Sequence, residues 1–163
     1  MSEHQFTYPN FTVRPHWGEY VIENLPLLVI VPCGVAVLLA FTFPFKWALE
    51  LIMLLITLYL IYRHQYITRL KFHIGSEQVM IQHGIFELRR SYLELYRVID
   101  YDERQTVMER FFGIKTVSIY SGDRSTPRLD IIGVPADIDL VAAVRERVEY
   151  NKRRKGVYEI SNR

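Results

Sequence analysis

Residues 25–43 read LPLLVIVPCGVAVLLAFTF and residues 45–63 read FKWALELIMLLITLYLIYR, and these two apolar runs decide the fold. The first run has no charged residue, and the second has only Lys46 and Glu50 before its last position. At about 1.5 Å per residue, a helix of either length approaches the ~30 Å hydrocarbon thickness of a bilayer. Pro44 separates the two runs and favours a break between helices. The sequence therefore predicts a hairpin of two transmembrane helices.

Basic residues gather at one end of this hairpin, whereas the turn between the runs carries only Lys46. Those at the open end are Arg14, Arg63, Arg69 and Lys71. Loops rich in Lys and Arg stay on the cytoplasmic side of a membrane. We therefore expect a multi-pass protein of the inner (plasma) membrane with both termini in the cytoplasm. A cleaved signal peptide is disfavoured, because a polar segment precedes the first run and a second run follows directly.

Polar and small residues inside the hairpin have structural explanations. Glu50 follows Lys46 by four residues, so an interfacial ion pair is favoured over a functional intramembrane carboxylate. Gly34 and Ala36 would let the first helix pack closely against a neighbouring helix. Cys33, the single cysteine, lies in the first run and is interpreted as a small apolar filler.

Beyond residue 63 the apolar residues recur with a period of two, which is typical of β-strands with one buried face. Glycine and polar turns separate the predicted strands, which lie at residues 69–74, 79–83, 90–95, 98–103, 116–121 and 128–132. After Pro135 the period returns to about 3.6, with Asp137 as the expected cap or first-turn acid. The predicted helix stripe comprises Ile138, Val141, Ala142, Val144, Arg145 and Val148.

This pattern divides the chain into five parts. We expect a cytoplasmic N-terminal segment, two transmembrane helices, a mostly β domain of five to seven antiparallel strands, and a loose tail. Their residues are 1–24, 25–43, 45–63, 64–155 and 156–163. A strand meander that is capped by one C-terminal helix is the layout of a pleckstrin-homology (PH) domain.

Four fragments resemble a family of small bacterial membrane proteins in which a two-helix hairpin precedes a PH domain. They are RPHWGEY at 14–20, IQHGIF at 81–86, LYRVIDYDERQT at 95–106 and ERFFGIKTV at 109–117. In the last fragment, the family signature falls on Phe111, Phe112 and Gly113, where the glycine supplies a backbone angle that other residues resist. The resemblance implies a split, curled antiparallel sheet with a helix across one open end. It implies no single activity and no catalytic residues.

A search for chemistry gives no catalytic, metal or cofactor site. The histidines lie apart, although His73 and His83 could face each other across the first strand pair; the five are His4, His16, His64, His73 and His83. The acidic residues Asp100, Asp102 and Glu103 alternate with other residues along a strand, which favours a solvated face over paired catalytic carboxylates. Residues 64–163 hold 17 basic and 14 acidic residues, which argues against a nucleic-acid-binding protein.

The basic residues nearest the hairpin are the candidate site for contact with anionic lipid head groups. They are Arg63, Arg69, Lys71, Arg89 and Arg90. The alternative is that such residues only set the orientation of the helices, which would account for Arg63 and Arg69. The basic run 152–155 could likewise contact lipid or a partner, but a solvated helix end is the commoner case.

Three functional hypotheses follow. The first is a membrane-anchored, non-catalytic interaction or scaffold module that binds another membrane protein or a second copy of itself. The second is a sensor of anionic lipids at the inner leaflet. The third is an accessory subunit of a membrane enzyme or transporter whose catalytic residues lie on another chain.

Overall fold

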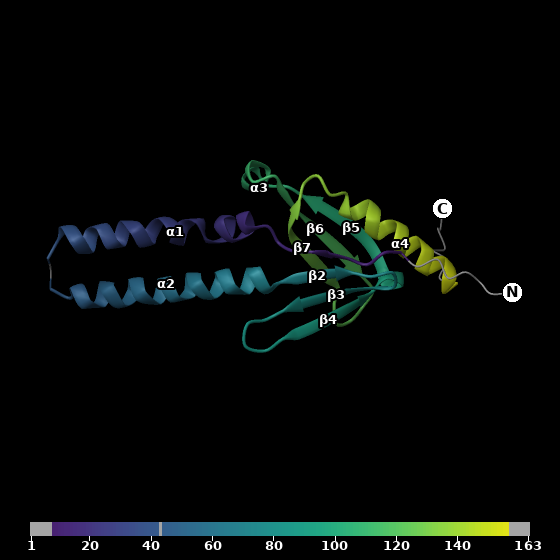
Figure 1. The fold of residues 1–163 in the computed structure, drawn as a ribbon, viewed down its shortest axis with the longest axis horizontal. Helices are drawn as coiled ribbons and strands as arrows, with labels where there is room; N and C mark the ends of the chain where they lie inside the picture. The colour runs from purple at the N-terminus through teal and green to yellow at the C-terminus, as the bar shows by residue number, and fades with distance from the viewer. Residues whose placement is uncertain (1–7, 43, 157–163) are drawn as a thin grey trace.

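The computed structural model describes residues 8–42 and 44–156. A long helical hairpin projects from a β-domain, and one helix crosses the end of that domain on the far side (Figure 1). His4 and most of the expected tail at 156–163 lie outside the described residues.

The hairpin consists of α1 (Trp17–Ala40) and α2 (Lys46–Arg69), each of 24 residues. Both helices are long and apolar enough to span a membrane. They extend beyond the predicted runs at the end next to the β-domain, α1 by eight residues and α2 by six. These extensions mix polar and apolar residues, and hydropathy alone therefore did not reveal them. The extension of α1 packs against protein, with Gly18 and Glu19 buried.

Two strands of the β-domain flank the hairpin in the sequence, one before α1 and one after α2. β1 (Phe11–Val13) precedes α1 and pairs antiparallel with β2 (Lys71–Ile74), which follows α2. The structure thus differs from the expected boundaries, because the segment 1–24 contributes a strand and the base of a helix. A three-residue strand without clear alternation gives no usable signal in the sequence. Its pairing with β2 fixes where the chain enters and leaves the hairpin.

Two antiparallel sheets form the rest of the domain, with the strand orders β1-β2-β3-β4 and β5-β6-β7. The remaining strands are β3 (Gln78–His83), β4 (Arg89–Glu94), β5 (Val98–Arg104), β6 (Ile114–Ser121) and β7 (Arg128–Pro135). A single 3₁₀ turn, η1 (Leu95–Arg97), joins the sheets at β4 and β5 without pairing these strands, so the barrel is split rather than closed. This confirms the predicted PH-like fold.

The register corrects one prediction about histidines. His73 on β2 lies opposite Met80, and His83 on β3 lies opposite Arg89, so the two imidazoles do not face each other. His73 Nδ1 instead lies 2.7 Å from the hydroxyl of Thr12 on β1. The polar contact links the two strands that flank the hairpin.

The inner faces of both sheets form one core, which α4 (Leu140–Arg154) completes across the open end. The carboxylate of Asp139 caps this helix by accepting the Ala142 N–H at 2.9 Å, so Asp137 is not the cap. The predicted stripe was partly wrong, since Ile138, Ala142 and Arg145 are exposed. The buried residues of α4 are Leu140, Val144, Arg147, Val148 and Asn151. Two of these five are polar, and they reach backbone carbonyls outside the helix, which hydrophobicity could not predict.

Candidate functional site

A basic groove lies where the hairpin joins the β-domain. Its cations are Arg14, just after β1, Arg69, the last residue of α2, and Lys71, the first residue of β2. The other wall is the connection between β3 and β4, residues 84–88. The groove encloses about 500 Å³, and Arg69 Nη1 donates to the Ile85 carbonyl at 3.3 Å. Pairing of β1 with β2 therefore brings together cations that are 55 residues or more apart in the sequence.

The three cations of the groove have no carboxylate partner within the described part of the chain. Two of the other candidates, Arg63 and Arg89, differ from them. Arg63 pairs with Glu23 of α1 and lies 5.6 Å from the Tyr66 ring, and Arg89 pairs with Glu87 at 3.2 Å. A paired cation attracts an external anion less, because its charge is already compensated. The groove cations are therefore the better anion site.

Arg90 lies close to the groove by strand register. Lys71 and Arg90 both lie opposite Gln82, on the two sides of β3, so all three residues point to the same face of the sheet. In the structure, Arg69 and Lys71 thus lie in one groove and Arg90 lies near it on β4. Arg63 lies outside this groove. Sequence reasoning did not include Arg14 in the lipid site, and only the unseen strand β1 could have placed it there.

The short helix α3 (Val107–Phe111) lies beside the base of α1 and was not predicted (Figure 1). Its signal was present in the sequence as Thr106-x-x-Glu109, a capping box. Thr106 N–H donates to Glu109 Oε2 at 2.6 Å, and Glu109 N–H donates to the Thr106 hydroxyl at 3.2 Å. The Thr116 hydroxyl on β6 donates to Glu109 Oε1 at 2.7 Å. The buried carboxylate thus fixes α3 to the sheet.

The pKa of the Glu109 carboxyl reflects two opposed influences. Burial raises this pKa, while the hydrogen bonds from Thr106 and Thr116 lower it, and the net result lies below the usual value. Both carboxylate oxygens accept hydrogen bonds, and hydrogen bonds to both oxygens favour the ionised form of the group. Glu109 is therefore a charged structural anchor rather than a proton donor.

An aromatic contact joins α1 to the segment after α3. The Trp17 ring meets the Phe112 ring edge-on at 5.3 Å, and a Cβ at Gly18 would lie 2.9 Å from the Phe112 side chain. Gly113 has φ of 66°, the left-handed conformation that glycine adopts easily. Of the family signature, Phe112 thus contacts the base of the hairpin and Gly113 adopts the left-handed turn after α3, whereas Phe111 is 84% exposed.

A second cavity of about 280 Å³ lies between the base of α1 and the sheet that contains β6 and β7. Glu19 lines it and is only 7% exposed, and its Oε2 has no hydrogen-bond partner in the described chain. Glu109, Arg104 and Arg128 also line this cavity. No group of three His, Cys, Asp or Glu side chains among residues 8–42 and 44–156 has the geometry to hold a metal ion.

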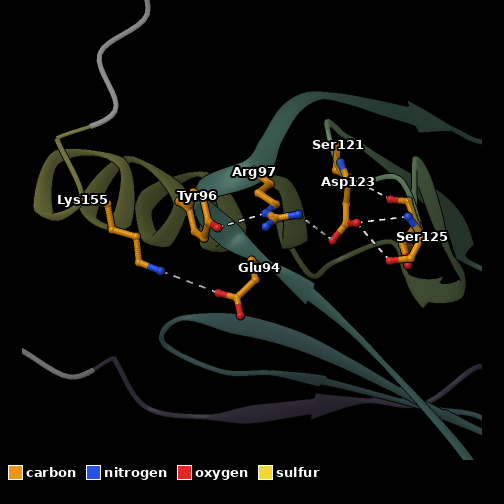
Figure 2. A network of polar contacts seen from close by, with 8 residues as sticks. Glu94, Tyr96, Arg97, Ser121, Asp123, Ser125 and Lys155 are labelled. Carbon is orange, nitrogen blue, oxygen red and sulfur yellow. Dashed lines mark hydrogen bonds and ion pairs between the residues drawn. The ribbon is translucent and has the colours of Figure 1, made fainter.

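A polar network at the far end of the domain closes the corner between the sheets (Figure 2). Arg97 Nη1 lies 3.4 Å from Asp123 Oδ2, and Arg97 Nε donates to the Tyr96 hydroxyl at 3.0 Å. The Ser125 N–H donates to Asp123 and lowers the pKa of that carboxyl. Lys155 Nζ lies 4.0 Å from the Tyr96 ring centre and 3.9 Å from Glu94, so this end of α4 has structural contacts.

The hairpin residues selected from the sequence have different surroundings. Gly34 faces α2, where an added Cβ would lie 2.4 Å from Met53 Sδ, whereas Ala36 is exposed on the outside of the hairpin. Gly34 therefore serves packing within the hairpin. The predicted ion pair is present at the turn, with Lys46 Nζ 4.0 Å from Glu50 Oε1.

Comparison with known proteins identifies the domain. The model of the family described as "Bacterial PH domain" matches residues 25–152, which is most of the chain and includes α1 from residue 25 onward and the whole of α2. No curated protein and no solved structure matches the chain. The family assignment agrees with the resemblance noted from the sequence.

Proposed function

The chain belongs to the bacterial PH domain family, and from this premise we propose that it is a non-catalytic module, anchored in the inner membrane, that binds anionic lipid head groups. One observation carries the proposal: Arg14, Arg69 and Lys71 line one groove at the base of the hairpin and lack carboxylate partners among the described residues. Each cation near an anionic leaflet gains about 1 kcal/mol. A lipid phosphate in this groove would supply the missing negative charge.

The proposed orientation places the groove at the cytoplasmic leaflet. The end of the hairpin next to the domain carries the groove cations and Arg63, whereas the turn carries only Lys46, which is paired with Glu50. By the positive-inside rule, the domain and both termini lie in the cytoplasm. Anionic lipids are concentrated in that leaflet.

Neutralising the groove should abolish a selective response to anionic lipid. We expect phosphatidylglycerol to raise the thermal midpoint of the delipidated, full-length protein in detergent more than phosphatidylcholine does. The double variant Arg69→Gln, Lys71→Gln should lose most of this difference, because about 1 kcal/mol of attraction is removed with each charge. Added salt should weaken the response of the unmodified protein. The measurement is differential scanning fluorimetry at matched lipid concentrations.

The matched control is the double variant Arg124→Gln, Arg153→Gln, which removes the same charge from exposed positions at the far end of the domain. It should respond to phosphatidylglycerol as the unmodified chain does. Equal loss in both double variants would show that net charge, not the groove, is responsible. Full-length protein is required, because deletion of residues 1–63 would also remove β1 from the sheet.

A second candidate is a module that binds another membrane protein or a second copy of itself. The supporting observation is the outer edge of β4, which pairs with β3 on one side and with no described strand on the other. Tyr92 on this strand is 46% exposed. An open edge can accept a strand from a partner.

A further inference from the structure

The helix α3 buries a carboxylate and exposes large apolar side chains, which is unusual for a helix that borders water. Its acidic residue Glu109 is 4% exposed and faces the sheet, whereas Val107 and Phe111 are 80% and 84% exposed. Arg110, its other charged residue, is exposed beside them. A surface helix normally buries its apolar side chains and exposes its charges. Contact with something apolar would explain this arrangement.

The connection between β3 and β4 presents a second apolar surface. Phe86 at its centre is 95% exposed, the highest value for any large apolar residue of the described chain, and Leu88 is 55% exposed. Gly84 at the start of the connection has φ of 114°, and a Cβ there would lie 1.9 Å from the Glu87 carbonyl oxygen. The backbone is thus built around a tight turn that projects these side chains outward.

Both surfaces lie at the end of the domain from which the hairpin leaves (Figure 1). The connection is tied to the last residue of α2 through Arg69 and the Ile85 carbonyl, and α3 is followed by Phe112, which contacts Trp17 at the start of α1. Each is therefore held at the level of one hairpin base. Together they flank the hairpin on its two sides.

The space available at this end fits lipid better than protein. From Arg63, where the apolar part of α2 ends, only six residues lead to Arg69 at the domain. This is about 9 Å of helix, close to the head-group layer of about 5–8 Å on each side of a bilayer. A folded partner would not fit between the domain and a leaflet at that separation.

We infer that the loop 84–88 and the helix α3 insert their apolar side chains into the leaflet next to the domain, as two wedges beside the hairpin. Phe86, Leu88, Val107 and Phe111 reach the boundary between head groups and acyl chains. Neighbouring cations such as Arg89 and Arg110 stay among the phosphates, which is the usual pattern at a membrane interface. The inference rests on membrane anchoring by the hairpin, and it does not depend on head-group binding in the basic groove.

The test uses full-length protein with Cys33→Ser and one new cysteine that carries an environment-sensitive fluorophore. The positions are Phe86→Cys, Phe111→Cys and, as a control, Ile99→Cys. Ile99 is 66% exposed and lies beside Gly122 in the turn after β6, away from the hairpin. Each protein is reconstituted into phosphatidylcholine vesicles, with and without phosphatidylglycerol. Quenching by nitroxide on the upper acyl chain is compared with quenching by iodide in the water.

We expect several-fold stronger nitroxide quenching, and several-fold weaker iodide quenching, at positions 86 and 111 than at 99. This result should appear in both lipid compositions, because burial of apolar side chains requires no lipid charge. Values like those at position 99, or insertion only with phosphatidylglycerol, would overturn the inference. Protection that disappears at one protein per vesicle would also overturn it, since a second copy would then be the cover. None of these outcomes depends on the groove variants.

Discussion

Replacing Gly133 with alanine should destabilise the junction between hairpin and domain by about 2–4 kcal/mol. Gly133 on β7 has φ of 63°, and a Cβ there would lie 2.9 Å from His16 N and 3.1 Å from Pro15 Cα. These neighbours are backbone atoms, so they cannot move aside as a flexible side chain could. His16 N–H also donates to the Gly133 carbonyl at 3.0 Å, and the substitution would strain this bond. Denaturant unfolding in detergent, followed by tryptophan fluorescence, measures the loss.

Gly113→Ala is the matched control for this prediction. Gly113 has a similar φ of 66°, but no atom lies within 4 Å of its added Cβ. This variant should lose only the about 1–2 kcal/mol that a left-handed alanine costs. Equal losses in the two variants would mean that close approach of the β1–α1 linker to β7 contributes nothing.

The substitution Glu109→Ala should lower the free energy of unfolding by about 2–3 kcal/mol. It removes the acceptor of the Thr106 N–H and leaves the Thr116 hydroxyl without its partner. The helix α3 would lose its attachment to β6, and the contact between Trp17 and Phe112 would loosen with it. Glu149→Ala is the control, because its pair with Arg153 at 3.8 Å is exposed and contributes less than about 1 kcal/mol.

The same carboxylate predicts a pH dependence. The folded pKa of Glu109 lies below its ordinary value of 4.5, so the ionised group stabilises the fold above that pH. This contribution is lost as the pH falls through the folded pKa. The difference in stability between the unmodified chain and Glu109→Gln should therefore be largest near neutral pH and shrink under acid conditions. A difference that grows below pH 4.5 would contradict the anchoring role.

The sequence predicted those features that depend on long or regular patterns. Two long apolar runs predicted the hairpin, alternation predicted six strands within a few residues, and the family resemblance predicted the PH-like topology. The predicted helix ends differ from the observed ones next to the domain, because the segment 17–24 contains Glu19, Glu23 and Asn24 and yet packs on the domain. Hydropathy reports how strongly side chains prefer water or an apolar phase. It therefore does not detect a helix end whose polar residues are buried against a sheet.

The candidate site was predictable only in part, because it depends on a long-range strand pair. Arg69 and Lys71 adjoin the second run and could be selected from the sequence. Arg14 joins them only because β1 pairs with β2 across the hairpin. The capping box of α3 was visible as Thr106 and Glu109, but a five-residue helix between strands was not expected. The outward apolar face of α3 could be recognised only once Glu109 was known to be buried.

Insertion of the hairpin between two paired strands has a mechanical consequence. In a chain with one linker, the domain could rotate freely below its anchor. Here three residues join β1 to α1 and one residue joins α2 to β2, and Gly133, Trp17 and Arg69 add contacts at the helix bases. Tilting of the hairpin would therefore move the domain with it.

The central claim is that α1 and α2 cross the membrane and hold the domain at its cytoplasmic face. It is tested most directly by a membrane-impermeant maleimide applied to spheroplasts that express full-length Cys33→Ser with one new cysteine. The reagent should label Phe45→Cys at the hairpin turn from outside, and should label Ser125→Cys in the domain only after the membrane is permeabilised. Labelling of Ser125→Cys in intact spheroplasts, or none of Phe45→Cys, would contradict the account.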